Sequence, residues 1–129
     1  MILPIFVADG IDAPTPIASM PGVSRFPVKG AVHTARQAQR LGIGGVLVFG
    51  VPGQKDLRGS EASAVDGIAQ EAVAAIKADT SIPVVTDLCL CGYTSHGHCG
   101  VLNGPNIDLP ATLSRYGEIA VAQARAGAD

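Results

Sequence analysis

The chain of 129 residues has no tryptophan and few aromatic residues of any kind, which account for 4% of it. So few aromatic rings offer little surface on which nucleic-acid bases could stack. Charged residues are also sparse, at 16%, and the formal net charge is −2 with a pI of about 5.8. These values give no electrostatic basis for binding nucleic acid or an anionic membrane.

Long hydrophobic runs are absent as well. No apolar stretch reaches the roughly 20 residues that a helix needs to cross a bilayer. Residues 1–9 lack the basic start and the apolar length of a secretory signal peptide. We therefore expect a cytoplasmic location and no membrane partner. In that reducing compartment an odd number of cysteines indicates free thiols or metal ligands in preference to disulfides.

Hydrophobic residues, by contrast, make up 47% of the chain, which suffices for one domain with a real core at this length. The sequence contains no linker-like or low-complexity tract, so we expect residues 1–129 to form a single domain. Three short apolar runs predict strands, at residues 2–7, 45–49 and 82–87. Each run is apolar at successive positions, which is typical of a parallel sheet covered on both faces.

Segments with helical periodicity alternate with these strands, at residues 30–41, 67–77 and 110–126. Their apolar faces comprise Val32, Ala35, Ala38 and Leu41 in the first, Ile68, Ala72, Ala75 and Ile76 in the second, and Leu113, Tyr116, Ile119 and Ala120 in the third. Side-chain oxygens of Asp66 and Asp108 are expected to cap the second and third helices, and Gly127 to end the third.

This order of strands and helices predicts an α/β fold made of three βα units with parallel strands. A complete eight-stranded barrel takes about 250 residues, so the chain forms either an open layered domain or part of a larger barrel. Two long connections, residues 8–29 and 88–109, follow the carboxyl ends of strands, where such folds place their active sites. The unclosed sheet edges and apolar helix faces favour a homo-oligomer.

The second of these connections contains almost all of the segment of greatest chemical interest, which runs from Asp87 to Gly100. Its fourteen residues hold all three cysteines, Cys89, Cys91 and Cys99, and two of the three histidines. Thiolates this close together are typical of a soft-metal site, zinc first. Because three protein ligands leave one position for water or substrate, three thiolates without a fourth ligand indicate an open site.

Several alternatives stay open at the level of the residues. His96 or His98 could close the site as a fourth ligand, or serve only as a hydrogen-bonding group. Cys99 could instead be a nucleophile activated by one of these histidines, or all three thiols could be small apolar residues without further chemistry. Asp87 could orient a substrate amine or a metal-bound water, or cap the loop amides at the strand end.

The segment from Asp87 to Gly100 closely resembles the metal loop of the zinc-dependent porphobilinogen synthases, also called δ-aminolevulinic acid dehydratases. The resemblance extends in register along the chain. It includes the first strand at residues 2–7, the signature at 19–23, and the second strand with its loop at 49–52, 55–56 and 59–62. The sequence is therefore identified as similar to the N-terminal part of that family.

The resemblance implies a fold that is roughly the first half of a (β/α)8 barrel, and assembly as a homo-oligomer. It also implies lyase chemistry in tetrapyrrole and haem biosynthesis, the condensation of two 5-aminolevulinate molecules. By position, Cys89, Cys91 and Cys99 correspond to the zinc ligands of the family, and Asp87 corresponds to an active-site carboxylate. The family's two Schiff-base lysines lie on later strands, and its N-terminal arm has no counterpart in this sequence.

These correspondences predict a porphobilinogen-synthase-like protein that retains a three-cysteine zinc site and lacks the Schiff-base lysines. Its lysines, Lys29, Lys55 and Lys77, do not fall at the ends of predicted barrel strands. We expect it to be inactive alone in the condensation. Two alternatives remain, the N-terminal portion of an active synthase and a non-catalytic module that binds zinc or another thiophilic metal such as lead.

Overall fold

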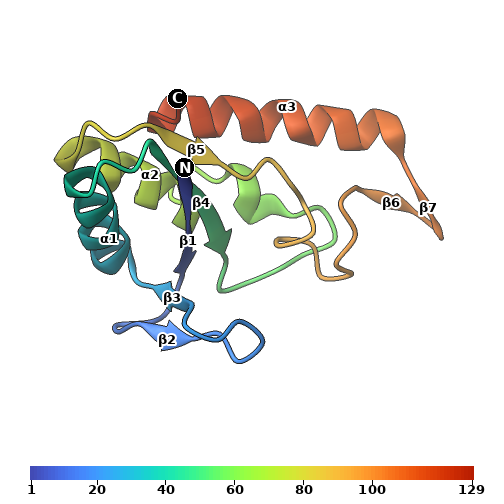
Figure 1. The fold of residues 1–129 in the computed structure, drawn as a ribbon. Coiled ribbons are helices and arrows are strands. Elements are labelled where there is room, and N and C mark those ends of the chain that lie inside the picture. The colour runs from blue at the N-terminus through green and yellow to red at the C-terminus, as the bar shows by residue number, and fades with distance from the viewer.

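The computed structural model describes residues 1–129 and places a five-stranded sheet at the centre of the molecule (Figure 1). The strands lie in the order β2-β3-β1-β4-β5. Strands β1, β4 and β5 are mutually parallel in neighbouring pairs, β3 joins β1 in parallel, and β2 is antiparallel to β3. The bounds are Ile2–Ala8 for β1, Thr15–Pro16 for β2, Ser24–Phe26 for β3, Gly45–Val51 for β4 and Val84–Thr86 for β5.

Three helices alternate with the parallel strands, which confirms the predicted α/β class. Their bounds are Val28–Arg40 for α1, Ile68–Asp79 for α2 and Leu109–Ala126 for α3. Helices α1 and α2 pack against the sheet and against each other, and α3 packs beside α2 (Figure 1). The strands β1, β4 and β5 confirm all three predicted strands, with β5 shorter than residues 82–87.

The core lies between the sheet and helices α1 and α2. Alternate strand residues point into it, and their branched side chains are at most 1% exposed: Ile5, Val7, Val46, Val48 and Val84. The helices contribute small or branched side chains, which allow their backbones to lie close to the sheet: Ala31, Ala35, Ala38, Ala72, Val73 and Ile76. Each large side chain in this cluster stabilises the fold by about 1.5–3 kcal/mol.

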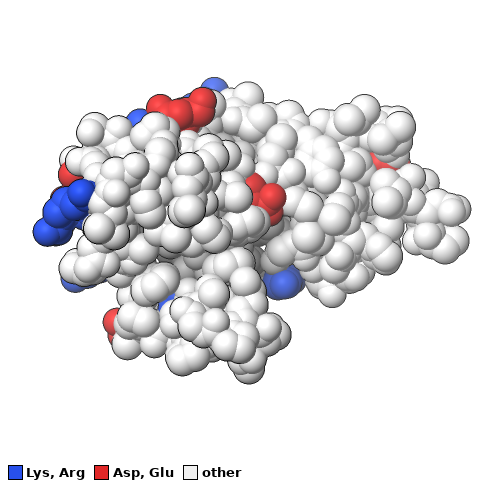
Figure 2. Space-filling view, in the orientation of Figure 1, with Lys and Arg blue, Asp and Glu red and all other residues white.

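The opposite face of the sheet is apolar but less covered. Phe6 and Phe49 stack there with ring centroids 5.0 Å apart, while Ile2 is 54% and Val85 40% exposed. Figure 2 shows that the molecule carries few charged side chains on the side seen in Figure 1. The prediction of a sheet covered on both faces is therefore wrong for residues 1–129, whose helices cover one face.

The helix ends differ in how well the sequence predicted them. The Asp108 carboxylate accepts a hydrogen bond from the Ala111 amide at 3.0 Å, and Gly127 ends α3 with φ of +103°, as predicted. The predicted cap at Asp66 is wrong, because Gly67 occupies the N-cap of α2 with no side-chain hydrogen bond. Leu41 is also wrongly placed in the core, since it lies beyond α1 and is 80% exposed.

The connections between the main strands and helices contain short elements that the sequence did not predict. Strands β2 and β3 form a hairpin within residues 8–29, and β6 (Leu102–Asn103) pairs with β7 (Asn106–Ile107) before α3. A 3-10 helix, η1 (Ser60–Ser63), lies between β4 and α2. No helix is both long and apolar enough to span a bilayer.

Candidate metal centre

The cysteine segment lies beyond the carboxyl end of β5 and contacts the loop that follows β4. Residues Asp56 and Thr94 form an isolated parallel bridge, and the Ser95 amide donates to the Asp56 carbonyl at 2.8 Å. Parallel strands bring their carboxyl ends to one edge of a sheet, so the loops after β4 and β5 meet there. The candidate site is therefore built where an α/β fold places its chemistry.

The three cysteines converge within this loop. The sulfur atoms of Cys89, Cys91 and Cys99 all lie within 4.8 Å of one another, and the Cys89 and Cys91 sulfurs are 3.4 Å apart. A tetrahedral zinc ion with Zn–S bonds of about 2.3 Å holds its sulfur ligands about 3.8 Å apart. The observed spacing brackets this value, so the three side chains fit a single thiophilic cation with small adjustments.

Hydrogen bonding within the cluster makes two of the thiols differ in how readily they ionise. Burial opposes ionisation of Cys89, yet the Cys91 amide and the neighbouring thiols donate to its sulfur and lower the pKa of Cys89. The hydrogen bond to Cys89 and burial together raise the pKa of Cys91 to about 12. The Cys89 thiol is therefore easier to ionise than the Cys91 thiol, whose proton a bound metal would replace.

The histidines stay outside this cluster. The amide of His98 donates to Nδ1 of His96 at 3.1 Å, so Nε2 of His96 is the nitrogen that faces the Leu57 carbonyl, at 3.2 Å. Both ring nitrogens of His96 are therefore engaged with backbone groups. The two imidazoles pack against each other with ring centroids 5.4 Å apart, and the metal-compatible group consists of the three cysteines alone.

Asp87 lies at the start of the segment and is half-buried. Its backbone is fixed on both sides, because its amide donates to the Val48 carbonyl at 3.1 Å and its carbonyl accepts from the Gln123 side chain at 2.8 Å. Burial raises the pKa of the Asp87 carboxyl. A carboxyl group that is held in place and shifted toward neutrality is suited to proton transfer.

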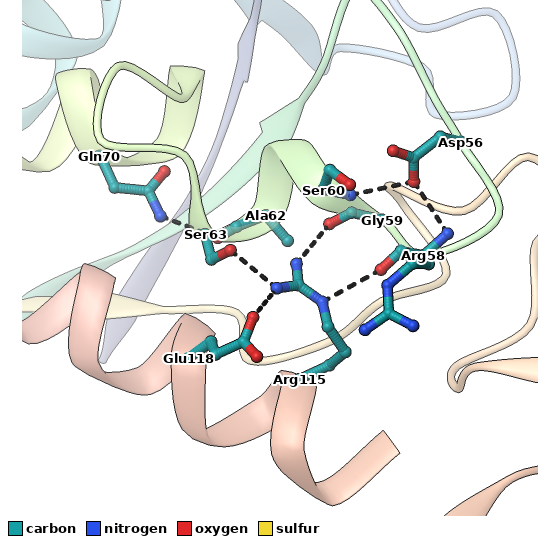
Figure 3. Close-up of polar contacts among 9 residues, drawn as sticks. All are labelled: Asp56, Arg58, Gly59, Ser60, Ala62, Ser63, Gln70, Arg115 and Glu118. Atoms are coloured by element: carbon teal, nitrogen blue, oxygen red, sulfur yellow. Dashed lines mark hydrogen bonds and ion pairs between the residues drawn. The ribbon is translucent and has the colours of Figure 1, made fainter. Parts of the chain in front are cut away.

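The loop after β4 is anchored by a buried guanidinium from α3 (Figure 3). Arg115, 5% exposed, donates to the carbonyls of Arg58 at 3.2 Å and Gly59 at 3.0 Å. The same group donates to the Ser63 hydroxyl at 3.0 Å and pairs with Glu118. Because residues 56–57 hold the cysteine segment in turn, Arg115 supports the site through an intermediate loop.

Sequence reasoning missed Arg115 and Gln123. The predicted apolar stripe of α3 is wrong at Leu113, which is 60% exposed, and at Ala120, which is also exposed, whereas Ile119 is buried as predicted. The face that is actually buried carries mostly polar residues: Thr112, Arg115, Ile119 and Gln123. Their spacing of three and four residues was a usable signal, but it marks a helix that packs on loop backbone, which needs hydrogen-bond donors and acceptors.

A cavity of about 870 Å³ lies away from the cysteines, between η1, α2 and α3. Its wall includes Ser63, Gln70, Glu118 and Arg125, and none of the three cysteines lines it. The thiols lie on the surface beside the sheet edge, with Cys99 exposed. Their mutual distances, and not an enclosed volume, are therefore what defines the candidate metal centre.

Comparison with solved structures supports the geometry. A crystal structure of δ-aminolevulinic acid dehydratase (porphobilinogen synthase) from Toxoplasma gondii, in complex with the reaction product porphobilinogen, matches with a TM-score of 0.93. The match is 31% identical in sequence and covers 99% of this chain and 38% of that one. The fold is therefore that of part of the dehydratase, a partial TIM barrel, as predicted.

Sequence comparisons agree along the whole chain. δ-Aminolevulinic acid dehydratases from Methanothermus sociabilis and Streptomyces coelicolor are 40% and 45% identical over 100% and 98% of this chain. The chain spans about 40% of the length of each. The dehydratase from Ruminiclostridium josui is 38% identical, and the chain covers 63% of it. The family profile of δ-aminolevulinic acid dehydratase matches residues 1–129, so the chain belongs to that family.

Proposed function

We propose that this chain is a metal-binding part of a porphobilinogen synthase, which holds one zinc ion through Cys89, Cys91 and Cys99. The observation that carries the proposal is the convergence of three thiol groups within 4.8 Å at the carboxyl edge of the sheet. Three thiolates suit zinc and leave a fourth position for an oxygen ligand. When bound, zinc would act as a Lewis acid that polarises a substrate oxygen.

The protein's own residues would bind and orient a substrate beside that site. We assign the catalytic carboxyl group to Asp87, whose raised pKa allows it to hold or accept a proton at its side-chain oxygen. Gln123 keeps the Asp87 backbone in place through the hydrogen bond to its carbonyl. The substrate we propose is 5-aminolevulinate, because the structurally similar enzyme from Toxoplasma gondii was captured with porphobilinogen.

We infer that residues 1–129 supply no amine nucleophile at this site, because none of the three lysines lies in the segment from Asp87 to Gly100. Lys29 and Lys77 lie in helices α1 and α2, and Lys77 pairs with Asp129 at 2.8 Å. Lys55 lies in the exposed loop after β4. We therefore propose that these residues alone bind the metal without condensing 5-aminolevulinate. A complete synthase would draw its Schiff-base lysines from further residues, and copies of the chain would assemble through the exposed face of the sheet.

Metal analysis of matched variants tests the ligand assignment. Zinc-loaded protein should retain about one zinc per chain after gel filtration, and Cys→Ala substitution at Cys89, Cys91 and Cys99 together should abolish it. His33→Ala, a change at an exposed histidine on α1, serves as the control and should keep the zinc. If the triple variant holds as much zinc as the unmodified chain, the assignment is wrong.

A separate assay tests the chemistry. Incubation of the zinc-loaded chain with 5-aminolevulinate, followed by a colour reaction for the pyrrole, should give no porphobilinogen above the level of the Asp87→Asn variant. Zinc-dependent product formation by the unmodified chain, absent in Asp87→Asn, would overturn the proposal that residues 1–129 are inactive alone. It would leave the zinc site itself intact.

A further inference from the structure

Cys99 needs an anchor that the first two cysteines do not need. Cys89 and Cys91 are separated by a single residue, Leu90, which is fully buried. Cys99 follows eight residues after Cys91 and is exposed, yet its sulfur lies within 4.8 Å of the other two. The residues between Cys91 and Cys99 are partly fixed, since Thr94 is buried and its hydroxyl donates to the His98 carbonyl at 2.9 Å. Cys99 itself still has to be held if it is to present its sulfur in one place.

One side chain supplies that anchor. The hydroxyl of Tyr116, on α3, donates to the backbone carbonyl of Cys99 at 2.6 Å. No other hydrogen bond joins the backbone of Cys99 to the rest of the chain. The remaining contacts between α3 and the segment fix its ends: Gln123 donates to the Asp87 carbonyl at 2.8 Å, and the Val101 amide donates to Thr112 at 3.0 Å.

Tyr116 is itself well fixed. Its ring packs against a small buried cluster that comprises Ala62, Leu90, Tyr93 and Ile119. Leu90, which stands between Cys89 and Cys91, belongs to this cluster, so the cluster joins α3 to the part of the loop that carries the first two thiols.

We propose that Tyr116 is a positioning residue of the metal site, which holds Cys99 in reach of a cation bound by Cys89 and Cys91. The inference rests on the proposed three-thiolate site and adds a residue outside it. Loss of the hydroxyl leaves the loop ends attached through Gln123 and Thr112 but frees Cys99. The site then binds its metal mainly through two sulfurs, with solvent in place of the third.

Cobalt(II) is the probe for this inference, because its absorption reports thiolate ligation directly. Tyr116→Phe should weaken cobalt binding by about tenfold or more, the size of effect seen when a group that orients a ligand is removed. Its sulfur-to-cobalt charge-transfer band should fall by roughly a third, which corresponds to one of three thiolates. Ser114→Ala, which removes an exposed hydroxyl from the same helix, should change neither quantity.

A second variant separates positioning from packing. Ile119→Val loosens the same cluster without touching the hydroxyl, and should lower thermal stability while leaving the charge-transfer band unchanged. The inference is overturned if Tyr116→Phe binds cobalt with unchanged affinity and spectrum, or if Ile119→Val reproduces its spectrum. Failure of the unmodified chain to bind cobalt at all would instead refute the metal site, and the role of Tyr116 with it.

Discussion

Gly59 shows how a single residue couples the two loops of the site. It has φ of +63°, in the left-handed region, and its carbonyl accepts from Arg115. A Cβ atom at this position would lie 2.8 Å from Leu90 Cδ2 and 3.2 Å from Tyr93 Cβ, both in the cysteine segment. The absence of a side chain is therefore needed for the backbone conformation and for the contact.

We predict that Gly59→Ala lowers the free energy of unfolding by about 2–4 kcal/mol, the sum of backbone strain and overpacking. Gly104→Ala is the matched control, since Gly104 has φ of +59° but nothing within 4 Å of the added carbon. That control should cost about 1–2 kcal/mol from strain alone. Urea unfolding measures both, and equal losses would mean that the contact with Leu90 and Tyr93 contributes nothing.

The titration of the cysteines predicts how metal affinity depends on pH. Thiolates bind metal and thiols do not, and the pKa of Cys91 near 12 keeps its proton in place at neutral pH. Binding must displace that proton, so the apparent affinity should rise with pH, about tenfold per unit for each proton displaced. Calorimetry in buffers of different ionisation enthalpy counts these protons. Zinc affinity that is constant between about pH 6 and pH 8 would exclude thiolate ligation.

At the scale of the elements, helix α3 holds the loop after β4 and the loop after β5 through hydrogen bonds. Its buried face carries Thr112, Arg115 and Gln123, and each of these side chains bonds to a loop instead of to the sheet. A buried arginine that satisfies backbone carbonyls replaces the missing hydrogen bonds of an irregular segment. The helix therefore stabilises the geometry of the site more than it adds to the central core.

We predict that Arg115→Met destabilises the chain by about 2–4 kcal/mol, because the Arg58 and Gly59 carbonyls and the Ser63 hydroxyl lose their donor in a largely buried setting. Arg36→Met is the control with the same change of side chain. It breaks a solvent-exposed pair with Asp79 and should have little effect on stability. Thermal unfolding distinguishes them, and comparable melting temperatures for the two variants would contradict the role assigned to Arg115.

The sequence predicted the regular elements well where period and packing agree. Strands with branched apolar residues and the cap at Asp108 follow from local chemistry, and they appear as predicted. The buried face of α3 could not be predicted in the same way, because its partner is loop backbone and not an apolar layer. Likewise, three cysteines within fourteen residues predicted one shared site, but the distances between their sulfurs follow only from the folded loop.

For the whole molecule, the uncovered face of the sheet has the clearest consequence. Apolar residues there remain accessible, including Ile2 at 54% and Val85 at 40%. Water contact with such a surface is unfavourable, so association is expected to cover it. Size-exclusion chromatography with light scattering should find a homo-oligomer at micromolar concentration.

Substitution tests where the association occurs. Val85→Lys, at the exposed position of β5, should shift the chain toward smaller species, whereas Val65→Lys, on the loop before α2, should not. Both valines are exposed, at 40% and 93%, so the comparison separates the sheet face from exposed apolar residues in general. A stable monomer in the unmodified chain would contradict association through this face.

The central claim is that Cys89, Cys91 and Cys99 together bind one metal ion. X-ray absorption at the zinc edge of the zinc-loaded chain tests it most directly, because it counts sulfur atoms around the metal and measures their distance. The account predicts three sulfur neighbours at about 2.3 Å with one lighter atom in the fourth position. A zinc ion with two or fewer sulfur neighbours, or one coordinated by nitrogen and oxygen alone, would contradict it.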